Sequence, residues 1–211
     1  TEEIVHANMR MGIGVTGVYQ ATEEQRSWLS DAYTYLRTYD DEYSKIHGFP
    51  PSIKLTTVKP SGTLSLLAGV TPGGHPSPAG PYYIRRIRIS SDSPLVDVCK
   101  SHGYVVEPQQ LFDGSKDKTT MVAEFPCSVP ETTPIGGDIS AVDQLELVKW
   151  LQANWSDNSV SVTVYYKKEE LDDIKQWLAD NYIDNVKTVS FLLYTGHGFV
   201  QAPYETISKE E

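Results

Sequence analysis

The sequence contains few cysteines, no long apolar run and fewer basic than acidic residues. Its two cysteines, Cys99 and Cys127, lie far apart in unrelated contexts, which excludes a disulfide framework and favours reduced, structural thiols. No apolar run approaches the length of a membrane span, and the first residues, which include the acidic Glu2 and Glu3, do not resemble a signal peptide. These absences predict a cytoplasmic protein without a membrane association.

Charge and histidine content narrow the function classes further. The net charge of −10 argues against nonspecific binding to nucleic acids. The five histidines are dispersed and do not cluster with cysteines, so the sequence predicts no metal site. A local basic site on this acidic chain would suit a small anionic ligand, although solvated surface cations explain the same pattern equally well. The cations in question flank one stretch of the chain: Lys54, Lys59, Arg85, Arg86 and Arg88.

That stretch, residues 55–67, has the pattern of a strand, a tight turn and the start of a helix. Pro60 ends the strand because proline has no N–H group, and Gly62 permits a backbone path that a Cβ would obstruct. A helix that begins near Leu64 has free N–H groups and the positive end of its dipole at the turn, which makes the turn a candidate phosphate-binding loop. An ordinary capped helix is the alternative. Three hydroxyl residues can provide the cap: Ser61, Thr63 and Ser65.

The rest of the chain alternates predicted strands with predicted helices. Glycines among apolar residues at 10–18 indicate a strand with close backbone packing rather than a dinucleotide-binding loop, and a capping box at Thr22 and Gln25 begins a long helix that Gly48 ends. This alternation predicts an α/β fold with parallel strands and a single domain over residues 1–211. Further strands are predicted at 82–89, 104–106, 120–125, 160–165 and 189–194, helices from Pro94 and over 139–155 and 167–182, and loops at 71–81 and 126–137.

The motifs in combination resemble the ribonucleotide reductases, and most of all the monomeric adenosylcobalamin-dependent (class II) ribonucleoside-triphosphate reductases. Lys-Pro-Ser-Gly-Thr-Leu-Ser at 59–65 is similar to their substrate-phosphate loop, and the resemblance continues through residue 88. Asn-Trp-Ser-Asp-Asn-Ser-Val-Ser at 154–161 resembles an element that leads into a barrel strand. Residues 192–203 resemble the closing strand and its exit, and residues 10–18 the strand after the active-site cysteine loop.

This resemblance implies a fold, an activity and a set of partners. The fold is the C-terminal half of the ten-stranded α/β barrel of ribonucleotide reductases, in which a thiyl radical starts the conversion of ribonucleotides to deoxyribonucleotides. The implied cofactor is adenosylcobalamin. The implied partners are a ribonucleoside di- or triphosphate, a thiol reductant system and the N-terminal half of the reductase, in the same chain or as a separate subunit. The implied phosphate-binding residues are Ser61, Gly62, Thr63, Leu64 and Ser65.

The radical cysteine of the family has no counterpart in this sequence. No Asn-x-Cys-x-Glu is present, and neither Cys99 nor Cys127 matches a redox cysteine, so no residue here is assigned a catalytic role. His75 matches a histidine that follows the loop in class II reductases, but beside prolines a structural role is expected. We therefore expect a fragment of a longer protein or one product of a split gene. Two alternatives are a nucleotide-binding or regulatory module without catalysis, and a partner that completes a barrel without touching a ligand.

Overall fold

The computed structural model describes residues 2–194 and 200–211, which fall into two compact units. The first consists of Thr1–Pro76 and Thr133–Tyr194, and the second of Ser77–Thr132 and Thr195–Glu211. The single domain expected over residues 1–211 stays a prediction. None of the helices in the described part of the chain combines the length and the apolar character needed to span a bilayer.

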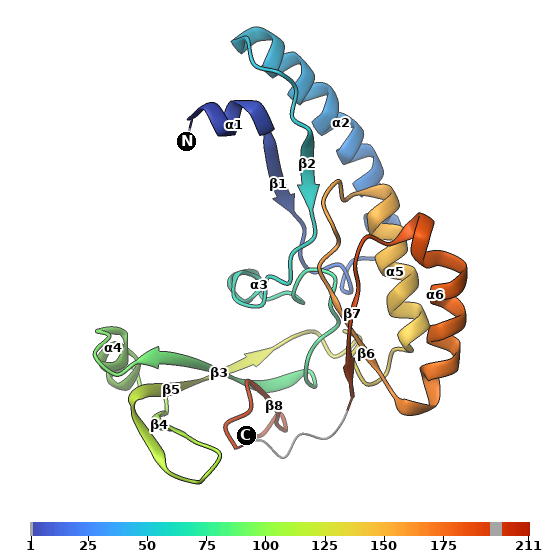
Figure 1. Cartoon of the computed structure of the whole chain (residues 1–211). Coiled ribbons are helices and arrows are strands. Elements are labelled where there is room, and N and C mark those ends of the chain that lie inside the picture. Colours follow the sequence, from blue (N-terminus) through green and yellow to red (C-terminus); the bar gives the residue numbers. More distant parts are fainter. Residues whose placement is uncertain (1, 195–199) are drawn as a thin grey trace. The chain divides into compact units, whose positions relative to one another are not determined.

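The first unit carries parallel strands and most of the helices (Figure 1). Strand β1 pairs with β2, and β6 pairs with β7, both in parallel; a parallel bridge between Val58 and Val160 connects the end of β2 to the segment before β6. Parallel pairing is therefore confirmed in this unit. Its elements are α1 (Glu2–Asn8), β1 (Arg10–Gly14), α2 (Glu23–His47), β2 (Lys54–Thr57), α3 (Leu64–Ala68), α5 (Ala141–Asn154), β6 (Thr163–Tyr166), the 3-10 turn η1 (Lys168–Glu170), α6 (Leu171–Asn185) and β7 (Ser190–Leu193).

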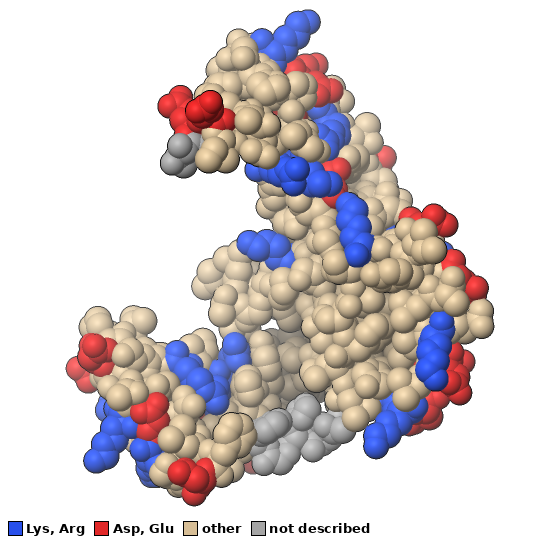
Figure 2. Space-filling model, in the orientation of Figure 1, with Lys and Arg blue, Asp and Glu red and all other residues tan. Residues whose placement is uncertain are grey.

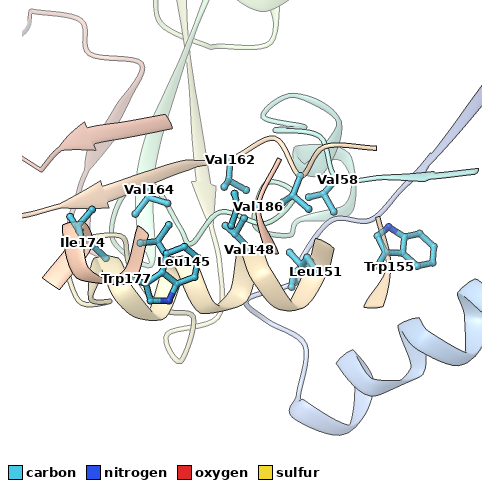
Figure 3. Close-up of a cluster of buried hydrophobic side chains, with 13 residues drawn as sticks. Val58, Leu145, Val148, Leu151, Trp155, Val162, Val164, Ile174, Trp177 and Val186 are labelled. Atoms are coloured by element: carbon cyan, nitrogen blue, oxygen red, sulfur yellow. The ribbon is translucent and has the colours of Figure 1, made fainter. Parts of the chain in front are cut away.

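The core of the first unit lies between α5, α6 and the parallel strands (Figure 3). The helix predicted over 139–155 is confirmed as α5, and its apolar stripe is buried at Leu145, Val148 and Leu151. In and before β6, every second residue points into this core, with Val160, Val162 and Val164 buried. Burying each such side chain contributes about 1.5–3 kcal/mol. From α6, Ile174 and Trp177 complete the core.

The long helix α2 begins and ends where the sequence predicts. The Gln25 N–H donates to the Thr22 hydroxyl (3.2 Å), and the Thr22 N–H donates to the Gln25 side-chain oxygen (2.9 Å), which completes the capping box. Gly48 ends the helix with φ +72, a conformation that favours glycine.

The second unit is an antiparallel sheet, so the expectation of parallel strands is wrong for this part of the chain. The sheet order is β4-β5-β3-β8. Strand β5 extends into residues 126–128, which were predicted to be loop. Pro126 pairs with Ile84 of β3 and lies beyond Ala123, the residue of β5 that is paired with the first residue of β4. Proline is tolerated there because no second neighbouring strand needs its missing N–H. The elements are β3 (Tyr82–Ser90), α4 (Leu95–Ser101), β4 (Val106–Gln110), β5 (Lys116–Ser128) and β8 (Tyr204–Thr206).

Two further expectations are corrected by the strand bounds. The strand predicted at 104–106 begins at Val106 and runs on to Gln110. Strand β7 is not the last strand, because β8 follows it. Of the predicted exit through residues 192–203, positions 195–199 lie outside the described residues.

Candidate functional site

The predicted phosphate-binding stretch follows the carboxyl end of β2. Val58 is completely buried and anchors the end of the strand through its bridge to Val160. Lys59 and Pro60 are exposed, and Ser61 then adopts φ +52, in the left-handed region that residues other than glycine rarely adopt. Strained backbone of this kind gathers at functional sites because the surrounding structure must hold it in place.

The turn from Ser61 to Leu64 leaves hydrogen-bond donors free. The Ser65 N–H donates to the Ser61 carbonyl oxygen (3.0 Å), which closes the turn. Among the described residues, neither the backbone N–H groups of Gly62, Thr63 and Leu64 nor the hydroxyls of Ser61 and Thr63 have a hydrogen-bond partner. Adjacent amides and hydroxyls without internal acceptors are the donors that a phosphate group requires.

The five predicted phosphate-binding residues are not equally accessible. Ser61 and Gly62 are half-buried, and Thr63 and Leu64 are exposed. Ser65 is only 1% exposed, so its hydroxyl is the least able of the group to meet an external ligand. The expectation that a hydroxyl caps the helix is not met: Thr63 is the N-cap residue of α3, and its side chain makes no capping bond.

A second loop, residues 71–76, packs behind the turn and is held by the segment after β1. The Thr16 hydroxyl donates to the Thr71 carbonyl oxygen (2.9 Å) and accepts from the Gly73 N–H (3.0 Å), while the Gln20 side-chain oxygen accepts from the Thr71 N–H (2.9 Å). A Cβ built on Gly73 would overlap the Lys59 carbonyl oxygen. The path of the phosphate stretch therefore depends on Thr16 and Gln20, whose partners are more than 50 positions away in sequence and which no local motif marks.

His75 is a structural histidine, as expected. Its Nδ1 lies 3.2 Å from the Pro72 carbonyl oxygen, and its Nε2 accepts from the Thr163 N–H of β6 (2.9 Å), so the neutral ring with the proton on Nδ1 fits both contacts. Burial lowers the pKa of His75, and the bond to Pro72 opposes this only in part.

This contact predicts a pH-dependent loss of stability. Because the pKa of His75 in the folded chain lies below the unfolded value of about 6.5, the unfolded chain binds the proton at a higher pH than the folded chain does. The His75 contribution should be complete above that pH and should be lost as the pH falls below it. Urea unfolding at pH 7.5 and 5.5 should show a smaller decline for His75→Gln than for the unchanged chain, with the exposed His102→Gln as control. Equal declines in all three would contradict the assignment.

The five cations that flank the stretch in sequence belong to two different units, with Lys54 and Lys59 in the first and the three arginines in the second. Arg86 forms ion pairs of 2.6 and 2.5 Å with two glutamates of its own sheet, and Arg85 donates to backbone carbonyl oxygens of that sheet. Lys54 opens β2, at the opposite end of the strand from the phosphate stretch. Of the five cations, Lys59 is the nearest in sequence to the turn, and a basic site around the turn stays a prediction.

The segment 154–161 packs against β2 and forms hydrogen bonds with it. The Asp157 carboxylate accepts from the Tyr33 hydroxyl (2.8 Å), from Arg37 (2.6 Å) and from the Leu55 N–H (2.8 Å). Burial opposes ionisation of Asp157, but the Leu55 N–H, the Tyr33 hydroxyl and Arg37 outweigh it and lower the pKa of the carboxyl. This element fixes the strand from which the phosphate stretch leaves.

The two cysteines form no disulfide with each other. Cys99 and Cys127 are free and half-buried, and burial raises the pKa of Cys127 although Arg85 opposes the shift. A raised pKa disfavours the reactive thiolate. Within residues 2–194 and 200–211, no three His, Cys, Asp or Glu side chains gather as a metal site would require.

Comparison with known proteins shows which class of protein this chain is similar to. No protein-family model matches the chain. The chain is 37% identical to an adenosylcobalamin-dependent ribonucleoside-triphosphate reductase of Euglena gracilis, covering 100% of this chain and 29% of that protein. It is 41% identical to a reductase of the same name from Levilactobacillus brevis, over 80% of this chain and 22% of that protein. A crystal structure of a B12-dependent (class II) ribonucleotide reductase matches with a TM-score of 0.82 and 31% identity, over 100% of this chain and 33% of the other.

By sequence and by fold, the chain is therefore homologous to one part of the ribonucleotide reductases, and the expected α/β half-barrel fold is confirmed. Within that class, the relatives are the adenosylcobalamin-dependent ribonucleoside-triphosphate reductases. The chain spans less than a third of the length of the curated relatives that cover it fully.

Proposed function

We propose that this chain is the part of a ribonucleotide reductase that holds the phosphates of a ribonucleotide while the rest of the enzyme reduces its ribose. The observation that carries the proposal is the turn Ser61–Leu64, whose amides and hydroxyls lack acceptors in the described chain and which lies in the stretch that resembles the family's phosphate loop. Its amides, with the hydroxyls of Ser61 and Thr63, bind the phosphate oxygens, and Lys59 adds positive charge beside them.

The reduction of the ribose is carried out by chemical groups that this sequence does not contain. The radical cysteine lies on an upstream segment or on a partner, and a thiol reductant system returns the enzyme to its reduced state. Adenosylcobalamin is the proposed cofactor of the whole enzyme because the relatives are named for it. No set of described side chains marks a cobalamin contact, so no step is assigned to this chain through the cofactor.

The proposal is tested by removing the two hydroxyls. In the full-length reductase that contains this chain, Ser61→Ala combined with Thr63→Ala should raise the substrate KM about tenfold or more, because each hydrogen bond to a charged group contributes on the order of 1.5–3 kcal/mol. Steady-state kinetics on a ribonucleoside triphosphate measure the change.

Two matched variants make this experiment specific. Ser27→Ala with Thr38→Ala removes two exposed hydroxyls of α2 and should leave the KM unchanged. Ser61→Gly removes the same hydroxyl as Ser61→Ala but also relieves the strained φ, so a similar KM for both would assign the effect to the hydroxyl. An unchanged KM in the Ser61 and Thr63 double variant would remove the phosphate assignment.

A further inference from the structure

Lys54 is the first residue of β2 and lies outside the phosphate stretch. Its side chain lies close to that of a second lysine, Lys187. The Nζ atoms of Lys54 and Lys187 each lie 2.6 Å from the carbonyl oxygen of Asp157. Because both contact the same atom, the two ammonium groups are separated by no more than twice that distance. Two like charges so close together repel each other unless an anion lies between them.

A third cation stands beside this pair. Arg10 of β1 is the partner of Lys54 in the parallel register of β1 and β2. Figure 2 shows Lys and Arg side chains gathered over the first residues of β1 and β2 and over the segment that leads into β7. We call the pair of Lys54 and Lys187 the dibasic edge, and Arg10 lies beside it.

The dibasic edge has no carboxylate partner of its own in the described chain. The Asp157 carboxylate is already shared by Tyr33, Arg37 and the Leu55 N–H, and only its backbone carbonyl oxygen meets the lysines. Across residues 2–194 and 200–211, no carboxylate forms an ion pair with any of the three cations. Burial lowers the pKa of Lys187 and the charge of Lys54 lowers it further, while the negative charge of Asp157 opposes the shift only in part.

The dibasic edge is separate from the phosphate stretch. Lys54 and Thr57 are the first and last residues of β2, and a strand rises about 3.3 Å per residue, so their backbones lie roughly 10 Å apart. The phosphate stretch begins beyond Thr57. An anion held by Lys54 and Lys187 therefore occupies a different place from one held by Ser61 and Thr63.

We infer that the dibasic edge is a second anion-binding site, which takes a phosphate-type dianion. Such a group accepts a charge-assisted hydrogen bond from each ammonium group at once and leaves oxygens for the guanidinium of Arg10. The same chemistry is offered by free pyrophosphate and by the phosphate tail of a nucleotide. The site does not depend on the proposed substrate loop.

The test is a titration of the full-length protein that contains this chain with pyrophosphate, followed by calorimetry. Lys54→Met combined with Lys187→Met should raise the pyrophosphate Kd at least tenfold. Lys45→Met with Lys100→Met changes the net charge equally at exposed positions and should leave the Kd unchanged. If the first pair fails to fold, Lys187→Met alone, at an exposed residue, serves instead. Equal Kd values in all variants, or no binding to the unchanged protein, would overturn the inference.

A second titration separates this site from the phosphate stretch. In the Ser61→Ala, Thr63→Ala protein, pyrophosphate should bind with its original Kd at the dibasic edge. A ribonucleoside triphosphate that binds there more tightly than pyrophosphate identifies a nucleotide as the source of the anion, and equal affinities identify free phosphate. If pyrophosphate binding disappears in this background, the anion belongs to the phosphate stretch and the dibasic edge is not a site.

Discussion

Gly73→Ala should lower the free energy of unfolding by roughly 2–5 kcal/mol. Two effects add at this position. Gly73 has φ +51, where any Cβ is strained, and the added Cβ would overlap the carbonyl oxygen of Lys59, which is backbone and has little freedom to move. The stretch that follows Lys59 carries the proposed phosphate ligands, so the same substitution should also impair substrate binding. Urea unfolding of the purified protein measures the first effect.

Gly69→Ala is the matched control for this substitution. Gly69 also has a positive φ (+62), but a Cβ built there meets nothing within 4 Å. Gly69→Ala should therefore lower the free energy of unfolding only by the conformational strain, about 1–2 kcal/mol. The difference between the two variants isolates the contact with Lys59. Equal losses at the two positions would show that the 71–76 loop moves aside and does not brace the phosphate stretch.

The features predicted correctly from the sequence are those whose signal is local. The capping box of Thr22 and Gln25 lies within four consecutive residues, and the apolar stripe of α5 repeats within one helix. The phosphate stretch rests on a local signal of the same kind, because its candidate ligands are contiguous from Ser61 to Ser65, and its phosphate-binding role stays a prediction. A short sequence window contains all the information that these features need.

Strand pairing in the second unit could not be predicted in the same way. Residues 82–128 show no local feature that distinguishes an antiparallel partner from a parallel one, and the proline at 126 is read as a strand breaker. Pro126 fits in β5 only because the pairing of β5 with β4 does not extend beyond Ala123 of β5. From there on, one side of β5 has no neighbouring strand. That fact depends on the whole sheet and not on the residues around Pro126.

The charges around the site illustrate the same limit. In sequence, Lys54 is grouped with Lys59 and three arginines; in the fold, it meets Lys187, which is more than 130 positions away. Arg86 looked available for a ligand until β3 placed it between two glutamates. Composition and spacing show that cations are present, but only the register of the strands decides which of them remain unpaired.

The parallel sheet of the first unit predicts that this chain works only with the rest of a reductase. In the described residues, β1 pairs only with β2, and β7 pairs only with β6. Both strands expose apolar side chains, with Met11 at 50% and Leu192 at 44% exposure. Unpaired strand edges with apolar side chains favour association with further strands. The rest of the barrel, including a segment with Asn-x-Cys-x-Glu, is the partner that we propose for these edges.

Alone, therefore, the 211-residue chain should form no deoxyribonucleotide from a ribonucleoside triphosphate when adenosylcobalamin and a thiol reductant are supplied. The radical sulfur must lie in contact with the ribose while the phosphates are held, and neither part of the barrel provides both. Mixed with a polypeptide that supplies the remaining barrel strands and the radical cysteine, the chain should elute as a complex on size-exclusion chromatography and gain turnover.

Two controls decide what such a gain means. Replacing the radical cysteine of the partner by serine should abolish turnover without dissociating the complex, whereas Ser61→Ala with Thr63→Ala should preserve the complex and raise the KM. A complex without turnover, in which the nucleotide still binds, would favour a nucleotide-binding module over an enzyme part. Turnover by this chain alone would overturn the proposal, because it would require a radical carrier that the sequence does not contain: neither Cys99 nor Cys127 lies in an Asn-x-Cys-x-Glu sequence.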